Sequence, residues 1–566
     1  MQIALTRTDI TPNLDDAAGV GMLGWAIPTN VVRGIATPLH ARCLLVHDSS
    51  SSTPVLALVS LEICYVTTLL RQRVLERLAA AHADIPVDDA ALLLTTTHTH
   101  SAPGGFSTRR FDNASIPGFQ PAVLEAYVAG TVQAIAQAWK TQQPGRLRLA
   151  ADRFPDTVPV AFNRALRAHH RNPEVTRRYG HDERHLAIDR EMTVVRAENE
   201  AGAPLGLIAW FSVHNTCVHS DNLLISADAK GYASTHCEQK QAEQGTPDFV
   251  AMMCQGASGD VTPNHRRWPG KKFPGGVSPD DHESARENGR MQGELALALL
   301  DAAATTPPLA GSLQVAISWR DMPGLAVDPD LVGGRAGVHA ASGAVGARML
   351  RGTWEGPGTP WPIGMALHLA TRVWQYWTRA TPFLRQDAHR RFLELHGNKA
   401  PLLAVGEGTV LGKGWFVNLI PPRIDAIVDH LAQQERAVGT EPWLPQVLPL
   451  HLVKIGRLGL VAIPCEATTI AGRRIRHTAA AALEVETALL TGYSDDYSGY
   501  VTTPEEYERQ GYEGAFTQFG QWTLPAWQTR VRKLARLMAD APRHGDAPSV
   551  PANLQARRHT RRRWLR

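Results

Sequence analysis

The sequence is poor in three features that define large classes of proteins. It has no apolar run near the roughly 20 residues needed to cross a bilayer, which excludes a transmembrane helix. Its net charge is only +4 over 566 residues and is spread along the chain, which argues against nucleic acid as a partner. No segment recurs at a fixed period, so a solenoid or propeller is not expected. The remaining class is a globular protein of ordinary composition.

Paired cysteines and a targeting signal are missing as well. The six cysteines are scattered, form no CxxC pair and lie mostly in apolar runs, as buried thiols do. The N-terminal segment "MQIALTRTDITPNLDDA" lacks the basic, apolar and small-residue regions of a secretory signal. The cysteine pattern favours a reducing compartment, and with no signal visible the expected location is the cytoplasm; a sequence from which a signal had been trimmed would belong to a secreted protein.

The first half of the chain alternates strands and helices. Residues 53–63 and 88–97 are continuous apolar runs that suit strands buried on both faces. Helical spacing follows over residues 67–83 and again over 122–140. This alternation predicts an α/β fold, with a central, largely parallel or mixed sheet or sheets flanked by helices.

The second half adds strands and a region of different texture. Paired strands are predicted within 191–214 and 448–464, and single strands within 247–256 and 485–492. Residues 323–411 combine glycine-rich loops, several tryptophans and one helical stretch, which predicts an inserted capping subdomain.

The C-terminal residues 541–566 lose all periodicity and finish on "ARRHTRRRWLR". They are predicted to be a basic, disordered tail. Such a tail attracts anionic lipid by about 1 kcal/mol per charge near a surface, so a weak contact with a membrane surface is one reading. A merely solvated tail is the more common case.

Polar, chemically active side chains follow most of the predicted strands. His98 and His100 follow the run "LLLTTT", and His214 follows "LGLIAWFSV". Asp260, Glu466 and the pair Tyr497 and Tyr500 come after three later strands. Because sites in open α/β sheets form at the carboxyl ends of strands, we expect these side chains to gather at one edge.

Two histidines, a carboxylate and a further oxygen donor form a reasonable first set of ligands for catalytic zinc. Each residue also has an ordinary structural explanation. A histidine after a strand is usually a hydrogen-bonded turn residue, an acid near a helix start is favoured by the helix dipole, and tyrosine usually packs. Asp260 is most simply a turn residue before proline. The pattern alone therefore does not select the ligands.

Several motifs in this order resemble the neutral/alkaline non-lysosomal ceramidase family. They extend from "TRTDITP" near the N-terminus to about residue 530, so the resemblance implies one catalytic domain over residues 1–535. The motifs are "THTHSAPGG" (97–105), "FNRALRAHHRNP" (162–173), "WFSVH" (210–214), "DAKGYAS" (228–234), "GDVTPN" (259–264), "IPCEATTIAGRRIR" (463–476) and "YSGYVTTPEEYERQGYE" (497–513).

The resemblance implies a zinc-dependent hydrolase that splits an N-acyl sphingoid base into fatty acid and amine. By motif position, the family's zinc ligands fall on His98, His214, Glu466 and Tyr500. The family's other active-site positions fall on His100, Arg164, Thr262 and Tyr512.

These positions also suggest roles. Zinc lowers the pKa of bound water to about 7, and an amide carbonyl needs a donor for its oxyanion. Tyr512 and His100 are the candidate donors, and His100 is also a candidate acid for the leaving amine. Arg164 suits the anchoring of a substrate oxygen or of a neighbouring carboxylate.

Four departures from the family pattern bear on these expectations. Thr262 stands where serine is usual, and Cys465 where glycine is usual. The stretch "HNTCVHSD" replaces a proline after His214 and adds His219 and Asp221 near the expected metal. The residues after "GQWTLPAW" are too few for the C-terminal immunoglobulin-like domain of typical members, a sandwich of about 100 residues.

Two rival functions stay open at this stage. One is an amidase or esterase of the same scaffold that acts on a different N-acyl or ester substrate, because fold similarity does not determine the substrate. The other is a non-catalytic ligand-binding homologue, against which the four retained ligands argue. Nothing in the sequence indicates an oligomeric state.

Overall fold

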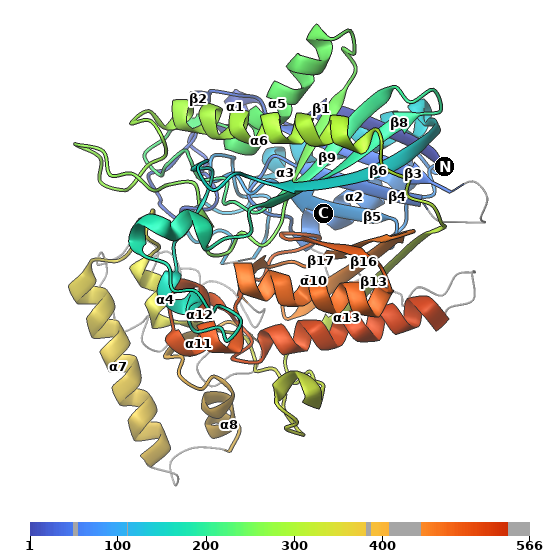
Figure 1. Cartoon of the computed structure of the whole chain (residues 1–566). Helices are drawn as coiled ribbons and strands as arrows, with labels where there is room; N and C mark the ends of the chain where they lie inside the picture. Colours follow the sequence, from blue (N-terminus) through green and yellow to red (C-terminus); the bar gives the residue numbers. More distant parts are fainter. Residues whose placement is uncertain (49–54, 110, 381–386, 407–442, 541–566) are drawn as a thin grey trace.

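The computed structural model describes residues 1–48, 55–109, 111–380, 387–406 and 443–540. Its framework has four layers: two β-sheets pack face to face, and helices cover both outer faces (Figure 1). Between the sheets, Leu58, Ile208 and Met252 of one pack with Leu460 and Leu489 of the other. The α/β class predicted from the sequence is confirmed.

The larger sheet is mixed and has eight strands. The two apolar runs predicted to be buried on both faces form strands β4 and β5, in which every residue is buried. The strands lie in the order β11 (Val250–Gln255), β9 (Pro204–Phe211), β8 (Glu191–Asn199), β6 (Gln143–Arg153), β1 (Gln2–Asp9), β3 (His40–His47), β4 (Val55–Leu61) and β5 (Leu92–Thr96).

The smaller sheet has four strands, and its members come mostly from the last third of the chain. The predicted strand pair within 448–464 forms an antiparallel hairpin here. The order is β13 (Leu313–Asp321), β16 (Val447–Ile455), β17 (Leu458–Ala462) and β19 (Thr487–Thr491).

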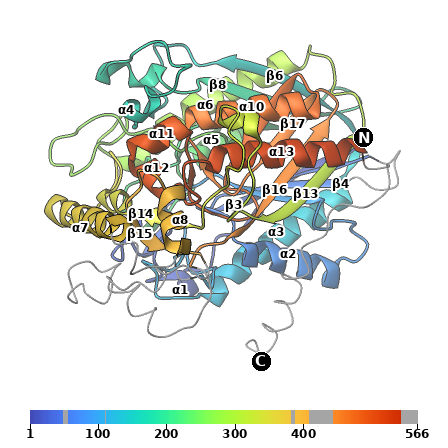
Figure 2. The same cartoon turned by 90° about the horizontal axis from the view of Figure 1, so that it is seen from below.

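Amphipathic helices cover the outer face of each sheet (Figures 1 and 2). The apolar stripe within the predicted helix 122–140 faces inward in α3: Leu124, Val128, Val132 and Ile135 are buried, and Trp139 is half-buried. The larger sheet carries α2 (Thr68–Ala81), α3 (Pro121–Thr141), α5 (Asp228–Glu243) and α6 (Asp281–Ala303), and the smaller carries α10 (Thr469–Leu483) and α13 (Thr523–Asp540).

Three strand pairs in the two sheets are parallel: β4 with β5, β9 with β11, and β17 with β19. The other pairs are antiparallel. Parallel neighbours bring their carboxyl ends to the same edge of a sheet. The histidines, carboxylates and tyrosines identified in the sequence follow strands of these three pairs.

Short strand pairs join the loops beyond that edge to one another. They are β12 (Val261–Thr262) with β7 (Phe162–Asn163), β18 (Glu466–Ala467) with β20 (Tyr500–Val501), β10 (Leu224–Ile225) with β2 (Gly34–Ile35), and β14 (Ala344–Gly346) with β15 (Pro401–Ala404). The short helices are α1 (Leu14–Ala17), α4 (Leu166–His169), α11 (Pro504–Arg509), α12 (Tyr512–Phe516) and the 3₁₀ turns at His181–Leu186, Pro329–Val332 and Ala347–Arg351.

The region predicted as a capping insertion, residues 323–411, lies in the connection between the neighbouring strands β13 and β16. Its described part contains β14, β15, α7 (Trp361–Ala380) and α8 (Asp387–Leu395). Its end at 411 and the predicted tail 541–566 lie outside the described residues, so these boundaries stay predictions.

Two expectations from composition can be compared with the structure. All six cysteines are buried and unpaired, as predicted. Among the described residues, no helix is both long enough and apolar enough to cross a membrane.

Candidate metal centre and adjoining cavity

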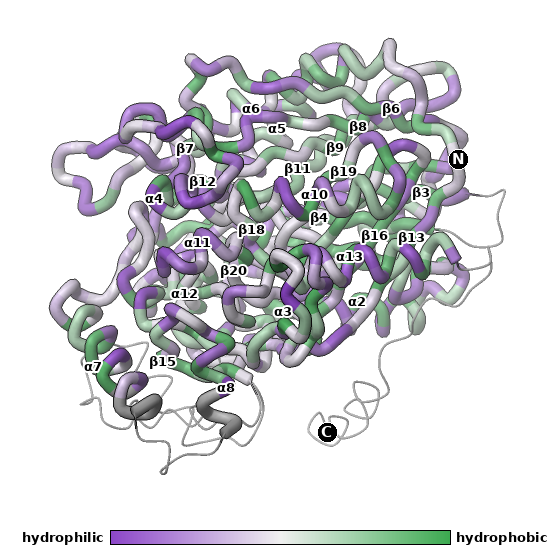
Figure 3. Tube along the Cα trace, turned by 60° about the horizontal axis from the view of Figure 1, so that its bottom comes forward, coloured by the Kyte–Doolittle hydropathy of each residue, from purple (hydrophilic) through white to green (hydrophobic). Residues whose placement is uncertain are grey.

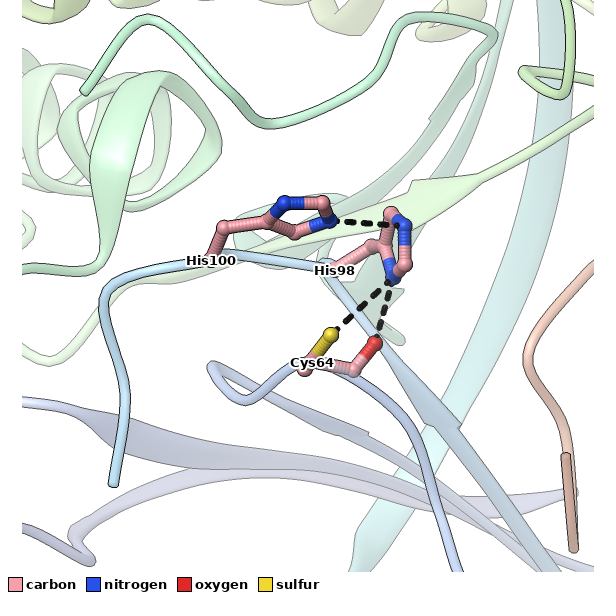
Figure 4. Close-up of side chains that lie close together, drawn as sticks. All are labelled: Cys64, His98 and His100. Carbon is pink, nitrogen blue, oxygen red and sulfur yellow. Dashed lines mark hydrogen bonds between the residues drawn. The ribbon is translucent and has the colours of Figure 1, made fainter. Parts of the chain in front are cut away.

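His98 leaves strand β5 in a backbone conformation that is rare for a residue with a side chain. Its φ is +65°, in the left-handed region. Nδ1 lies 2.6 Å from the carbonyl oxygen of Cys64, and this contact requires a proton on Nδ1 (Figure 4). Burial lowers the pKa of His98 to about 4. The imidazole is therefore neutral near pH 7, with its lone pair on Nε2.

His214, just past β9, is oriented in the same way. Its Nδ1 lies 2.6 Å from the carbonyl oxygen of Ser258 and 3.1 Å from that of Val261. Two acceptors at one nitrogen place the proton there. Nε2 then carries the lone pair, and it lies 3.0 Å from Oε2 of Glu466.

Glu466, the first residue of β18, completes a group of three buried donors. Its Oε2 also lies 3.7 Å from Nε2 of His98. Tyr497 donates to Oε1 over 2.5 Å and Tyr493 donates to Oε2 over 3.3 Å. Burial alone would raise the pKa of Glu466, but the two imidazoles and Tyr497 lower it below its usual range. One donor atom from each of His98, His214 and Glu466 lies within 4.8 Å of the others.

Tyr500 adds an oxygen atom beside these three donors. It lies opposite Glu466 in the register of β18 and β20, which brings the two side chains together from distant segments. Its hydroxyl is 3.5 Å from Nε2 of His214 and accepts a hydrogen bond of 2.9 Å from Nη2 of Arg164. The four residues on which the family's zinc ligands fall therefore lie together in the fold.

The chemistry of this donor set fits a divalent cation. Two imidazole nitrogens, an ionised carboxylate and a phenol oxygen are ligands that zinc accepts. Both histidines donate the N–H of their other ring nitrogen, Nδ1, to a backbone carbonyl. This is the arrangement that orients metal-binding imidazoles in proteins.

His100 lies beside the group rather than away from it. Its Nε2 is 3.1 Å from Nε2 of His98, and its Nδ1 is buried with no hydrogen-bond partner (Figure 4). Because His98 has a lone pair at Nε2, His100 donates the proton in this contact. Once a metal engages that lone pair, the Nε2–H of His100 is left for another acceptor.

Trp25 packs against His100, and His219 packs against Trp25. The Trp25 ring meets His100 edge-on at 5.0 Å and stacks on His219 at 5.8 Å. His219 is therefore two rings away from the donors. Its Nδ1 lies 3.2 Å from Asp281 and its Nε2 2.8 Å from the carbonyl oxygen of Pro274, so both nitrogens face acceptors. Burial alone would lower the pKa of His219, but Asp281 raises it above its ordinary value.

Arg164 anchors carboxylates, which was one of the two roles expected for it. Its guanidinium donates to Glu355 over 2.6 Å and to Glu513 over 3.1 Å, in addition to the bond with Tyr500. Thr262 donates its hydroxyl to Glu355 and does not line the cavity. The hydroxyl of Thr262 is thus linked to the centre through Glu355 and Arg164.

A cavity of about 280 Å³ opens over the donors. His98, His100, His214, Glu466 and Tyr500 lie on its wall. The remaining wall is mostly apolar and includes Leu23, Trp25, Phe111, Val345, Met349, Leu350, Leu367, Leu402, Leu403 and Phe516.

Tyr512 lies on the same wall, and its ring is 5.6 Å from that of Tyr500. Burial raises the pKa of Tyr512, so its hydroxyl remains a neutral donor. Of the eight residues predicted for the site, seven therefore lie on the cavity wall, and Thr262 contacts Glu355, which does so too.

Asp260 does not join the donors. Its Oδ1 accepts hydrogen bonds from the backbone N–H and the hydroxyl of Thr469, at the start of α10, and its Oδ2 accepts from Asn163. It belongs to a second buried group, in which one donor atom each of His169, Asp260 and Glu506 lies within 4.8 Å of the others.

Sequence reasoning missed two parts of the site. Glu355, buried within the predicted capping region, accepts hydrogen bonds from Arg164, Thr262, Asn264 and Thr216. Its surrounding sequence "TWEGPG" has no strand and no motif to mark it. Tyr493 follows β19 as Tyr497 does, and that position after a strand was the one available signal.

A family model supports the similarity noted in the sequence. Residues 1–529 match the family described as "Neutral/alkaline non-lysosomal ceramidase, N-terminal". The chain is 31% identical to the neutral ceramidase of Pseudomonas aeruginosa, over 93% of this chain and 70% of that protein. It is 30% identical to neutral ceramidase A of Dictyostelium discoideum, over 98% of this chain and 74% of that protein.

Solved structures agree with these sequence matches. The crystal structure of the Pseudomonas aeruginosa neutral ceramidase superposes with a TM-score of 0.74 at 28% identity, covering 97% of this chain and 76% of that chain. A structure described as ceramidase complexed with C2 superposes with a TM-score of 0.75 at 29% identity, covering 97% of this chain and 77% of that chain.

Proposed function

Because the chain belongs to the neutral/alkaline non-lysosomal ceramidase family, we propose that it hydrolyses the amide bond of a ceramide-type N-acyl sphingoid base with zinc as its metal. The products are a fatty acid and a sphingoid amine. The observation that carries the proposal is the convergence of His98, His214 and Glu466 at the wall of a largely apolar cavity.

His98, His214, Glu466 and Tyr500 would hold the ion. Bound zinc supplies Lewis acidity and lowers the pKa of a water molecule to about 7. The backbone carbonyls of Cys64 and Ser258 keep both imidazoles in the tautomer that can bind a metal. Arg164 holds the Tyr500 oxygen in place by its hydrogen bond.

His100 is the residue placed to move a proton. Burial, and then the neighbouring His98, lower the pKa of His100 well below its usual value, so this imidazole starts the reaction neutral. His100 carries its proton on Nε2 while it donates to the His98 lone pair, and with that lone pair on the ion the Nδ1–H tautomer becomes available. In this tautomer Nε2 accepts the proton that the attacking water loses and then donates it to the nitrogen of the departing amine. The amine must leave protonated, because an amide anion is too poor a leaving group.

Tyr512 is the candidate donor to the carbonyl oxygen of the substrate. Its hydroxyl is neutral and on the cavity wall, so it can donate a hydrogen bond as negative charge develops on that oxygen. A preorganised donor of this kind contributes about 3 kcal/mol to the stabilisation of a transition state. The apolar wall beyond it suits a hydrocarbon chain.

The test is a substrate panel with purified, zinc-loaded protein. It contains a short-chain ceramide, N-acyl amides of other amines, and acyl esters, and the release of each free amine or alcohol is measured. We expect release of sphingoid base from the ceramide, at the highest kcat/KM of the panel. Turnover of another acyl compound without release of sphingoid base would instead identify a different substrate class.

A second measurement tests the metal. Metal analysis should find one zinc per chain, and removal by a chelator should abolish turnover until zinc is returned. Stoichiometric zinc without turnover of any acyl substrate would contradict a catalytic function.

A further inference from the structure

Helix α7 exposes a continuous apolar face. Trp361, Met365, Leu369 and Val373 recur every four residues, so they form one stripe along the helix. Their exposed fractions are 61%, 37%, 61% and 47%. Every exposed residue of α7 whose side chain is described is apolar or aromatic: Trp361, Pro362, Met365, Ala366, Leu369, Ala370, Val373 and Tyr376.

Two described polar residues of α7, Gln375 and Arg372, face the protein instead. Gln375 is buried and donates to the carbonyl oxygen of Lys399 over 2.8 Å. Arg372 donates to the carbonyl oxygen of Asn398 over 2.5 Å. A surface helix of a water-soluble domain normally shows the opposite arrangement, with its polar face outward. A stripe of this kind marks an interaction surface.

The inner side of the same helix borders the cavity over the metal donors. Leu367 lies on the cavity wall, as do Thr359 and Pro360 just before the helix. Figure 3 shows α7 at the edge of the molecule, beside β15, whose Leu402 and Leu403 also line the cavity. The exposed apolar stripe and the binding cavity therefore belong to neighbouring parts of one structure.

Three arginines lie close to one another beside this helix. Arg348 and the exposed Arg351 precede α7, and Arg372, on the side of the helix that faces the protein, lies near them. Burial, and then the charges of Arg509, Arg351 and Arg372, lower the pKa of Arg348, so these groups are close enough to repel one another. Arginines beside an apolar stripe complement the anionic head groups at a bilayer surface.

We propose that the outward face of α7 docks on a lipid bilayer that carries anionic head groups, with the stripe inserted at the level of the head groups. The choice of a bilayer over a protein partner rests partly on the proposed function, since a cavity for an N-acyl sphingoid base must receive its substrate from a membrane. An outward face on which no described side chain is charged, next to arginines, fits the boundary between head groups and acyl chains.

The test compares two variants that carry the same exchange at similarly exposed leucines. Leu369→Glu places a charge in the stripe, and Leu537→Glu places it on α13, where Leu537 is 51% exposed. Binding is measured by co-sedimentation with vesicles of phosphatidylcholine alone and with added phosphatidylserine. Wild type and Leu537→Glu should bind the anionic vesicles, while Leu369→Glu should bind them more weakly by about tenfold or more.

Hydrolysis provides the second measurement. On long-chain ceramide in anionic vesicles, Leu369→Glu should lose about tenfold in rate, whereas its kcat/KM on a dissolved short-chain ceramide should stay at the wild-type value. Equal vesicle binding by wild type and Leu369→Glu would overturn the proposal, as would an equal loss in Leu537→Glu. A wild-type dimer that Leu369→Glu dissociates, with unchanged vesicle binding, would assign the stripe to a second copy instead.

Failure of this proposal is separate from failure of the proposed function. Vesicle binding requires no turnover, so it tests α7 even if no ceramide is cleaved. Conversely, cleavage of short-chain ceramide by a protein that ignores vesicles would retain the function and remove the docking role of α7.

Discussion

Two buried clusters of this protein contain the same kinds of residue and differ in what surrounds them. The first is His98, His214 and Glu466, and the second is His169, Asp260 and Glu506, each with donor atoms within 4.8 Å. Residue type and spacing alone would assign a metal to either cluster.

The difference lies in where the hydrogen bonds go. In the first cluster the backbone carbonyls take the Nδ1 protons, so that the Nε2 lone pairs and a carboxylate oxygen face a cavity. In the second cluster the carboxylate oxygens already accept bonds from the groups that start helices α10 and α11. Glu506 accepts from Asn172, Thr468 and the backbone N–H of Thr503.

The adjoining cavity at the second cluster measures only about 10 Å³, at the lower limit for holding one water. We therefore interpret the first cluster as a metal centre and the second as a structural network. A donor set binds a metal when its lone pairs remain available, and it stabilises a fold when they are already used.

The largest expected effect distinguishes His98 of the first cluster from His169 of the second. His98→Ala should lose the zinc and lower kcat/KM by about three orders of magnitude or more, because the variant lacks one of the nitrogen ligands of the metal. His169→Ala is the matched control, since it also deletes a buried imidazole. It should keep one zinc per chain and near wild-type kcat/KM. Loss of zinc in His169→Ala, or its retention in His98→Ala, would reverse the assignment.

The second prediction concerns stability. Asp260→Ala should lower the free energy of unfolding by about 3 kcal/mol, because it removes the acceptor for Thr469 at the start of α10 and leaves Asn163 without its partner. Chemical denaturation measures this loss, and metal analysis of the same sample should still find one zinc. A stable variant lacking zinc would show that Asp260 belongs to the metal centre.

The third prediction tests the link between Arg164 and the donors. Glu355→Gln should reduce kcat/KM by about 10- to 100-fold, the usual cost of altering a group that orients a metal ligand. The reason is that Arg164 would lose one of its two ionic partners and position Tyr500 less firmly. Zinc affinity, measured by competition with a chelator, should fall along with activity. An unchanged affinity would limit Glu355 to substrate binding.

The smallest expected effect is a change of slope with pH. Burial, and then the charge of Asp260, raise the pKa of Glu506 from 4.5 to about 7. The stabilising contribution of its protonated form is complete below about pH 4.5 and is lost as the pH rises to about 7.

Glu506→Gln should remove this contribution to the slope, which is at most about 1.4 kcal/mol per pH unit for one proton. Denaturation of both proteins across this range measures it. Parallel curves for the two proteins would mean that the pKa of Glu506 is not raised in the fold.

Much of the framework followed from local pattern. The apolar runs that became β4, β5, β9 and β11 were recognisable because strands buried on both faces contain few polar residues. The helix α3 was recognisable from its stripe, since helical period and burial coincide there. The order of strands was not predictable, because β6 crosses to pair with β1 and no local signal specifies a distant partner.

The same division holds for the site. The sequence by itself determined which strands end in histidine, carboxylate or phenol, and the motif order indicated the family. Only the tertiary structure decided that Glu355, from the long connection between β13 and β16, lies beside Arg164. It also decided that Asp260 accepts hydrogen bonds from Thr469 at the start of α10 instead of facing the metal donors. Residue type determines what a side chain can bind, but the competition among buried neighbours for its lone pairs determines what it does bind.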